Sequence, residues 1–185
     1  MRIISGRARG TKLYTLDGEN TRPTLDRVKE PLFNILNFKL KDSVVLDLFA
    51  GSGALGLESI SRGARQAIFC ECNLSAIKII KKNIEKTKFK EESLVIKGDF
   101  EKVLKTLNDN DVKVDIVFLD PPYKTDLVYK ALKCILNTKL LNEDSKIVVE
   151  TDDIERIKND IEKIGLMIDD IRKYGRVHLV FINIK

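Results

Sequence analysis

The sequence predicts an α/β protein with a doubly wound, mostly parallel seven-stranded sheet of the Rossmann-like type. After Asp42, short apolar segments rich in β-branched residues alternate with longer segments of helical periodicity, which is typical of strands joined by crossover helices. The strand segments are apolar on both faces, as in Val44–Leu46, and this is typical of strands covered by helices on both sides. The C-terminal segment contains two strand-like runs joined near Gly175, which predict an antiparallel hairpin at the sheet edge.

The first 41 residues predict two elements that precede the sheet. Residues 1–23 are polar and glycine-containing, and short alternations at Arg2–Ile4 and Lys12–Tyr14 predict a small β-hairpin or an extended arm. Thr24 is a suitable helix cap, and a leading helix is predicted over residues 24–41. Its apolar positions are Val28, Leu32, Ile35 and Leu36.

The remaining elements follow in alternating order. The predicted strands are Val44–Phe49, Ala67–Cys72, Leu94–Gly98, Val114–Leu119, Lys146–Glu150, Leu166–Tyr174 and Val177–Ile184. The predicted helices cover residues 54–62, 74–88, 99–108, 125–138 and 153–164. We therefore expect two parts, a basic N-terminal hairpin or arm in residues 1–23 and one α/β domain in residues 24–185.

Length and composition limit the class of protein. The 185 residues predict one domain, and 43% hydrophobic with 33% charged residues argue against disorder. No apolar run approaches the roughly 20 residues of a membrane span, so no membrane partner is expected. The three cysteines form no CxxC pair, which favours reduced thiols in a cytoplasmic protein over a disulfide framework or a zinc site.

The net charge of +5 is unevenly distributed. Residues 1–41 contain nine Lys or Arg and four Asp or Glu, whereas residues 42–185 contain 24 of each. The whole excess therefore lies in the first fifth of the chain. A local basic excess indicates either a polyanionic partner such as nucleic acid or a solvated basic arm.

A glycine-rich segment follows the first predicted strand. It contains G-x-G-x-x-G at Gly51, Gly53 and Gly56, and Asp47 stands four positions earlier. A dinucleotide pyrophosphate at the helix N-terminus would be repelled by this carboxylate, whereas an amine-bearing ligand would be attracted by it. The alternative is that Asp47 caps the helix and that the glycines only permit close contact.

Two further acids match a ligand with a ribose and a base. Glu71 ends the second predicted strand, 20 residues after Gly51, where an acid can accept hydrogen bonds from ribose hydroxyls. Asp99 follows the third strand and is either an acceptor for an adenine amine or a helix N-cap. An amino-acid end, a ribose and the absence of phosphate together indicate S-adenosylmethionine (SAM).

The fourth predicted strand ends in Asp120-Pro121-Pro122-Tyr123. Two prolines restrict the backbone to an extended turn, and this turn follows a strand predicted to lie beside the first, where doubly wound sheets bind ligands. The Asp120 carboxylate and the Pro121 carbonyl can accept the N–H groups of an exocyclic amine, and Tyr123 can stack on its base. The alternative is a proline-capped strand end with a surface tyrosine.

These motifs resemble those of SAM-dependent methyltransferases that act on exocyclic amines. The N-terminal sequence is similar to the bacterial RsmD family in particular, through Met1–Gly6, Arg9-Gly10, Lys12-Leu13, Arg22–Glu30 and Leu32–Leu36. The match continues through Ala50–Glu58 and Ser61–Ala64. The chain departs from the family at Asn73 and Cys72, where relatives often carry Asp and a larger apolar residue.

The resemblance implies the SAM-dependent methyltransferase fold and a guanine-N2 methyltransferase of 16S ribosomal RNA. It implies a monomer, with SAM but no metal as cofactor, and RNA in a 30S subunit or an assembly intermediate as partner. The expected catalytic residues are Asp120, Pro121, Pro122 and Tyr123. The expected cofactor residues are Asp47, Phe49, Gly51, Ser52, Gly53, Glu71, Cys72, Asp99 and Phe100. The expected RNA-binding residues are Arg2, Arg7, Arg9, Lys12, Arg22 and Arg27.

Three other functions remain open on the sequence. A DNA or protein-amide methyltransferase uses a similar turn, a ribosome-assembly protein could keep the fold without catalysis, and the glycines also fit a nicotinamide-dependent oxidoreductase. Two smaller expectations concern single features. Cys70 and Cys72 flank Glu71 on one face and are expected in the core. The lysines of residues 81–90 stand among the acids Glu85, Glu91 and Glu92, which favours a solvated face over a second RNA site.

Overall fold

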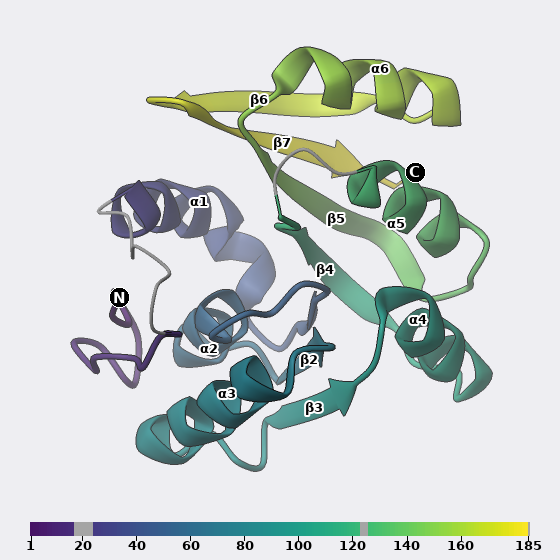
Figure 1. Ribbon diagram of the computed structural model, residues 1–185. Helices are drawn as coiled ribbons and strands as arrows, with labels where there is room; N and C mark the ends of the chain where they lie inside the picture. Colours follow the sequence, from purple (N-terminus) through teal and green to yellow (C-terminus); the bar gives the residue numbers. More distant parts are fainter. Residues whose placement is uncertain (17–23, 123–125, 185) are drawn as a thin grey trace.

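The computed structural model describes residues 1–16, 24–122 and 126–184, without the side chains of residues 24–26. Its centre is a seven-stranded sheet in the order β3-β2-β1-β4-β5-β7-β6 (Figure 1). β7 is antiparallel to both its neighbours, and the other strand pairs are parallel. The strands are β1 (Val44–Asp47), β2 (Gln66–Glu71), β3 (Ser93–Lys97), β4 (Val114–Leu119), β5 (Leu141–Thr151), β6 (Ile168–Tyr174) and β7 (Val177–Asn183). The predicted fold class, with its antiparallel C-terminal hairpin, is confirmed.

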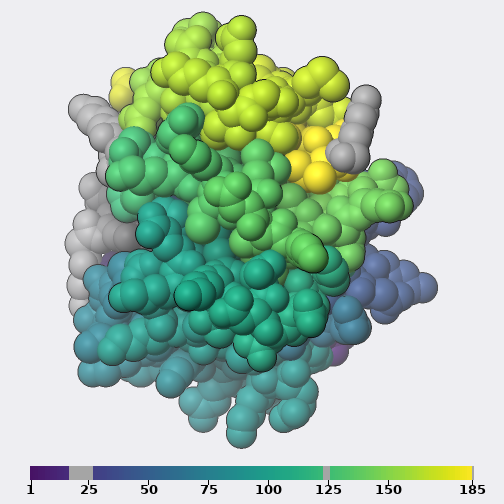
Figure 2. Space-filling model, turned by 90° about the vertical axis from the view of Figure 1, so that its right-hand side faces the viewer, coloured from purple at the N-terminus to yellow at the C-terminus, as the bar shows by residue number. Residues whose placement is uncertain are grey.

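Six helices cover the two faces of this sheet. They are α1 (Thr24–Leu40), α2 (Ala54–Ser61), α3 (Leu74–Thr87), α4 (Phe100–Asp109), α5 (Leu127–Leu136) and α6 (Ile154–Ile164). Apolar side chains of α4, α5 and α6 share one buried cluster with the sheet. Those of α1 and those of α2 with α3 form two further clusters on the opposite face (Figure 1). Figure 2 views the molecule from the side covered by α4, α5 and α6.

The strand order reverses between β1 and β4, which places a ligand-binding crevice outside their carboxyl ends. Asp47 at the end of β1 is in register with Phe118 of β4. The Leu48 N–H extends this pairing by donating to the Phe118 carbonyl at 3.1 Å. The chain segments that follow β1 and β4 therefore leave the sheet side by side.

Two predictions about the elements are wrong in detail. β5 begins at Leu141, five residues before the predicted Lys146. Val114 of β4 pairs with Leu141 and Ile116 pairs with Lys146, so the intervening residues of β5 bulge out of register. These residues are largely polar, which is why hydrophobic periodicity does not reveal them as a strand. Ile35, predicted as a buried position of α1, is 37% exposed.

The N-terminal segment is folded onto the domain. Arg2 and Lys12 form an antiparallel bridge, and we call residues 1–13 the N-terminal hairpin. Its apolar residues Ile3 and Leu13 are 0% and 7% exposed and join the cluster formed by α2 and α3. The predicted hairpin is present, and it packs against these two helices. Among the described helices, none combines the length and hydropathy needed to cross a membrane.

Candidate active site

The glycine loop between β1 and α2 is shaped by close contacts. Gly53 is the N-cap of α2 with φ of 79°, a left-handed conformation that side-chain-bearing residues rarely adopt. A Cβ on Gly56 would lie 2.3 Å from Cε1 of Phe69 in β2, so only glycine lets α2 approach the sheet at this point. A Cβ on Gly51 would meet nothing within 4 Å, so the space over this part of the loop is open.

Asp47 lies beneath this loop and is 2% exposed. One carboxylate oxygen accepts the Gly56 N–H at 3.3 Å, so the carboxyl group contacts the first turn of α2. Burial, opposed by this hydrogen bond and reinforced by the negative charge of Glu71, raises the pKa of Asp47 to about 7. The structure therefore shows Asp47 bound to the first turn of α2. Its attraction of a ligand amine stays a prediction.

Glu71 connects the ends of β1 and β2. One oxygen accepts the Gly51 N–H at 2.9 Å, and the other accepts those of Cys72 and Asn73 at 2.9 and 2.8 Å. A carboxylate has about four acceptor positions, so three of them hold the local backbone. Glu71 therefore orients the glycine loop in addition to its predicted contact with a ribose.

Two of the predicted cofactor residues are aromatic and are in contact with each other. The rings of Phe49 and Phe100 are tilted against each other with centroids 5.7 Å apart. Asp99 precedes Phe100 and is the N-cap of α4, accepting the Lys102 N–H at 3.0 Å. This hydrogen bond lowers the pKa of Asp99 below its usual value. The N-cap reading of Asp99 is correct, and its predicted contact with adenine is compatible with the half-exposed side chain.

Cys72 differs from the prediction that it shares the core with Cys70. Cys70 is 2% exposed within β2 and its pKa is raised to about 12 by burial. Cys72 is exposed because β2 ends at Glu71 and the alternation of faces ends with it. Cys72, itself one of the predicted cofactor residues, is therefore accessible next to Glu71.

The Asp-Pro-Pro turn leaves β4 beside the glycine loop. β4 ends at Leu119, Asp120 is partly exposed, Pro121 is buried and Pro122 is exposed. The remaining predicted catalytic residue, Tyr123, lies outside the described residues. Because β1 and β4 are paired in parallel, the predicted cofactor loop and the predicted catalytic turn lie at the same edge of the sheet.

Sequence analysis missed Asn83 of α3, which is 0% exposed. Its side-chain amide donates to the carbonyl of Ser52 in the glycine loop at 2.9 Å. The same side chain donates to the Tyr14 carbonyl at 3.0 Å and accepts the Tyr14 N–H at 2.8 Å. Asn83 thus connects the N-terminal segment to the predicted cofactor loop. A polar residue amid the isoleucines of an amphipathic helix was the available signal.

Sequence analysis also missed the role of Glu58 in α2, whose side chain is 0% exposed. Its carboxylate accepts the backbone N–H groups of Ile4 and Ser5 at 2.8 and 3.0 Å. It also forms ion pairs with Lys29 of α1 at 3.1 Å and with Arg62 at 2.8 Å. One buried carboxylate therefore holds the N-terminal hairpin against α1 and α2.

The predicted RNA-binding residues have different environments. Arg2, Arg9, Lys12 and Arg27 are exposed. Arg7 forms an ion pair with Glu92 at 2.8 Å and its guanidinium lies 4.9 Å from the centre of the Phe89 ring, with its side chain still 57% exposed. Arg22 lies outside the described residues.

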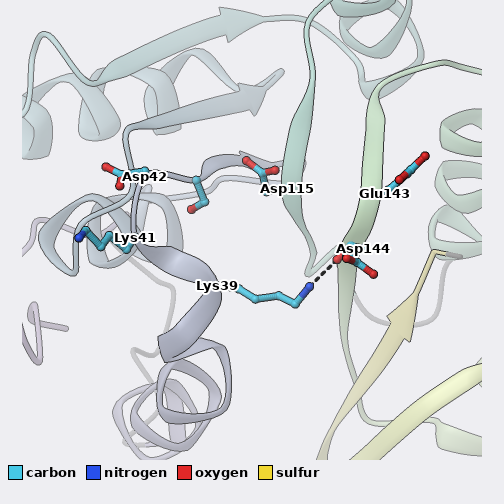
Figure 3. Close-up of a pocket in the computed structure, with 7 residues that line it drawn as sticks. Lys39, Lys41, Asp42, Asp115, Glu143 and Asp144 are labelled. Carbon is cyan, nitrogen blue, oxygen red and sulfur yellow. Dashed lines mark hydrogen bonds between the residues drawn. The ribbon is translucent and has the colours of Figure 1, made fainter.

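A depression lies at the edge of the sheet opposite to the glycine loop (Figure 3). Its volume is about 230 Å³, and the Lys39 ammonium donates to the Asp144 carbonyl at its rim. It is lined by Lys39, Lys41, Asp42, Ser43, Asp115, Glu143 and Asp144. Asp115 is engaged there by the Val44 N–H and the Asn142 amide. Within the described ranges, no group of three or more His, Cys, Asp or Glu residues is arranged to bind a metal.

The chain matches known proteins over nearly its full length. The family model described as "Conserved hypothetical protein 95" matches residues 1–183. Ribosomal RNA small subunit methyltransferase D of Haemophilus influenzae is 38% identical over 152 residues, which are 82% of this chain and 79% of the relative.

Solved structures share the fold. An Escherichia coli chain, yhhF, described as a candidate methyltransferase, superposes with a TM-score of 0.82 at 30% identity and covers 99% of this chain and 97% of its own. SMU.776, a candidate methyltransferase complexed with S-adenosylhomocysteine (SAH), superposes with a TM-score of 0.72 at 16% identity over 87% of this chain and 49% of its own. The second likeness concerns the fold alone. From the matching family model and the curated relative, the chain belongs to the RsmD family.

Proposed function

We propose that this protein transfers a methyl group from SAM to the exocyclic N2 amine of one guanine in 16S ribosomal RNA. The observation that carries the proposal is the pairing of β1 with β4, which brings the glycine loop and the Asp-Pro-Pro turn to one edge of the sheet. The small-subunit RNA named for the H. influenzae relative supports the substrate class. The choice of the N2 amine rests on the family resemblance and on the acceptor chemistry of the turn.

The residues at the glycine loop fit SAM. The open space over Gly51 leaves room for a ligand against the loop. Burial and, to a smaller extent, the negative charge of Glu71 raise the pKa of Asp47, and a cationic ligand amine would stabilise its ionised form. Glu71 has acceptor capacity for a ribose hydroxyl, and Phe49 with Phe100 offers apolar surface. When bound, SAM supplies an electrophilic methyl group on a sulfonium.

Asp120 and Pro121 would prepare the nucleophile. The amine of guanine is a poor nucleophile because its lone pair is delocalised into the ring. If the Asp120 carboxylate and the Pro121 carbonyl each accept one N–H, the nitrogen lone pair is directed toward the methyl group. As the new C–N bond forms, the S–CH3 bond of SAM would break with its electron pair left on sulfur, which gives SAH. The nitrogen would then carry one excess proton, which leaves to Asp120 or to water. Tyr123 is proposed to stack on the flipped base.

The substrate class is tested by methyl transfer with purified protein and tritiated SAM. The acceptors are small-subunit particles and naked 16S RNA from cells lacking this enzyme, with genomic DNA and total protein as controls. We expect label in RNA alone, and comparison of particles with naked RNA identifies the assembly stage. Label in DNA or protein, or no label in either form of RNA, would reject the proposal.

We further propose that the protein acts as a monomer in the cytoplasm, where its ribosomal substrate is assembled. Light scattering of the purified protein alone and with SAH measures the oligomeric state, and a mass near 21.1 kDa is expected. A concentration-independent dimer would reject the monomer.

A further inference from the structure

The N-terminal hairpin and α3 form one continuous surface in the folded protein. Tyr14, directly after the hairpin, is bound by Asn83 of α3 through both its backbone N–H and its carbonyl. Ile3 and Leu13 share a buried cluster with Ile80 and other residues of α3. Figure 1 shows the N-terminal segment beside α2 and α3. Basic residues that are about 70 positions apart in sequence are thereby combined on one side of the molecule.

This surface is far more basic than the chain as a whole. Residues 1–16 and 74–92 together contain ten Lys or Arg and three acids, Glu85, Glu91 and Glu92, which gives a net charge of +7, whereas the whole chain has a net charge of +5. One of these acids, Glu92, is paired with Arg7. All ten side chains are exposed. We call these ten residues the hairpin–α3 surface: Arg2, Arg7, Arg9, Lys12, Lys78, Lys81, Lys82, Lys86, Lys88 and Lys90. The remainder of the chain is net acidic, so the basic excess of the chain lies in these two segments.

The lysines of α3 are ordered along the helix. Lys78, Lys82 and Lys86 follow one another at intervals of four residues, which places them in one row on the helix surface over about 12 Å. Lys86 is fixed against the N-terminal segment, since its ammonium lies 4.4 Å from the centre of the half-exposed Tyr14 ring. Glu85 is four residues after Lys81, so these two side chains are neighbours on the helix surface. They lie beside the row formed by Lys78, Lys82 and Lys86.

The row leads to the predicted cofactor edge. α3 begins at Leu74, directly after the segment in which Glu71 binds the backbone of Cys72 and Asn73. Lys78 lies about one helical turn from that end, and Lys86 lies near the other. A polyanion bound along the row would therefore extend to the edge of the sheet where Asp120 and the glycine loop lie.

We propose that the Lys78-Lys82-Lys86 row of α3 binds the phosphate backbone of the RNA substrate and extends the contact of the N-terminal hairpin. This inference rests on the proposed function for the identity of the polyanion. Evenly spaced ammonium groups contact phosphates without reading the sequence. The row therefore contributes affinity and approach of the RNA, and it does not take part in methyl transfer.

The test compares two double variants with the same change in net charge. K82E/K86E reverses two charges of the row. K105E/K133E reverses two exposed lysines of α4 and α5, on the side of the molecule seen in Figure 2. Binding of a 16S RNA transcript and of small-subunit particles is measured from 50 to 250 mM KCl, together with SAH binding and steady-state methyl transfer.

We expect K82E/K86E to raise the Kd and the KM for RNA at least tenfold at 150 mM KCl. The slope of log K against log salt should decrease by about 1.5 to 2, because two phosphate contacts and their released counterions are lost. SAH affinity and kcat at saturating RNA should stay within about twofold of wild type. K105E/K133E should leave the slope unchanged.

Three results would overturn this inference. They are equal effects of the two double variants, an unchanged slope in K82E/K86E, and wild-type protein that binds RNA without dependence on salt. Binding is measured without turnover, so a wild-type protein that binds through this surface but transfers no methyl group would refute the proposed function and leave the RNA-binding row standing.

Discussion

Asp120 is the residue on which the proposed chemistry depends most directly. Asp120→Asn preserves the size of the side chain and one acceptor oxygen but removes its charge and its capacity to take a proton. We expect kcat to fall by about 10² or more, with SAH affinity within about twofold of wild type because the glycine loop is unchanged. Single-turnover transfer and calorimetry measure the two quantities. Turnover near that of the wild type would show that the turn does not orient the amine.

Asp47 gives a prediction about pH. Its pKa in the folded protein is about 7, above its usual 3.8, because it is buried. Between these values the folded state holds a proton that the unfolded state has released, so this group lowers the free energy of unfolding as the pH rises from about 4 to about 7. An amine-bearing ligand requires the ionised carboxylate, so the affinity for SAH should rise over the same range, up to pH 7.5, where the ligand amine is still charged.

The matched variant for this pH dependence is Asp47→Asn. It keeps an acceptor for the Gly56 N–H but has no charge to titrate. We expect its SAH affinity to be at least tenfold weaker at pH 7.5 and nearly constant from pH 5.5 to 7.5. Isothermal titration at four pH values decides the matter, and a wild-type protein whose SAH affinity is flat across this range would argue against the amine contact.

Among the elements, the N-terminal hairpin depends on close contact with α2. Gly6 and Gly10 both have positive φ, of 80° and 84°. A Cβ on Gly6 would lie 1.8 Å from the Ser61 carbonyl oxygen, whereas one on Gly10 would meet nothing within 4 Å. Gly10→Ala should therefore cost only the left-handed backbone strain of about 1–2 kcal/mol. Gly6→Ala should additionally displace the hairpin.

Hydrogen exchange distinguishes the two substitutions. The N–H groups of Ile4 and Ser5 are bonded to Glu58 in the folded protein. We expect their protection to be lost in Gly6→Ala and retained in Gly10→Ala. Equal protection in both variants would show that the hairpin can stay docked without the close approach of Gly6.

The buried carboxylate of Glu58 connects three elements and gives a second prediction at this scale. Glu58→Gln removes the carboxylate charge that pairs with the Lys29 ammonium, whose side chain is 2% exposed. We expect a loss of about 3–5 kcal/mol in the free energy of unfolding. Adding Lys29→Met should recover part of that loss, and urea denaturation of the single and double variants measures the coupling. Additive losses would mean that the pair contributes no specific stabilisation.

At the scale of the whole molecule, the sheet could be predicted from sequence but the position of the N-terminal segment could not. Apolar runs such as Val114–Leu119 identify strands because both of their faces are buried. The polar start of β5 carries no such pattern. Docking of the hairpin could not be predicted either, because Glu58 binds backbone N–H groups that are 53 and 54 residues away in sequence. Nearly every residue has a backbone N–H, so the sequence does not indicate which of them a buried carboxylate will bind.

In the candidate site, the residues at the strand ends could be predicted from the sequence, but those that connect distant segments could not. Asp47 and Glu71 end their strands and Asp120 directly follows its strand. The parallel pairing of these strands brings their ends together, so the common location of the three acids follows from the strand pattern. Asn83 was not predicted, because its partners, Tyr14 and Ser52, become neighbours only in the folded chain. The sequence places the charge excess in the first 41 residues. In the folded chain α3 lies beside the hairpin, so the lysines of α3 enlarge this basic surface.

The central claim is transfer to the N2 amine of one guanine, and nucleoside mass spectrometry tests it most directly. Small subunits from cells lacking the enzyme are incubated with SAM and either wild-type protein or Asp120→Ala, and the 16S RNA is digested and mapped. The account predicts N2-methylguanosine at a single position with wild-type protein and none with the variant. Methylation at another atom or base, at many positions, or undiminished in Asp120→Ala would contradict it.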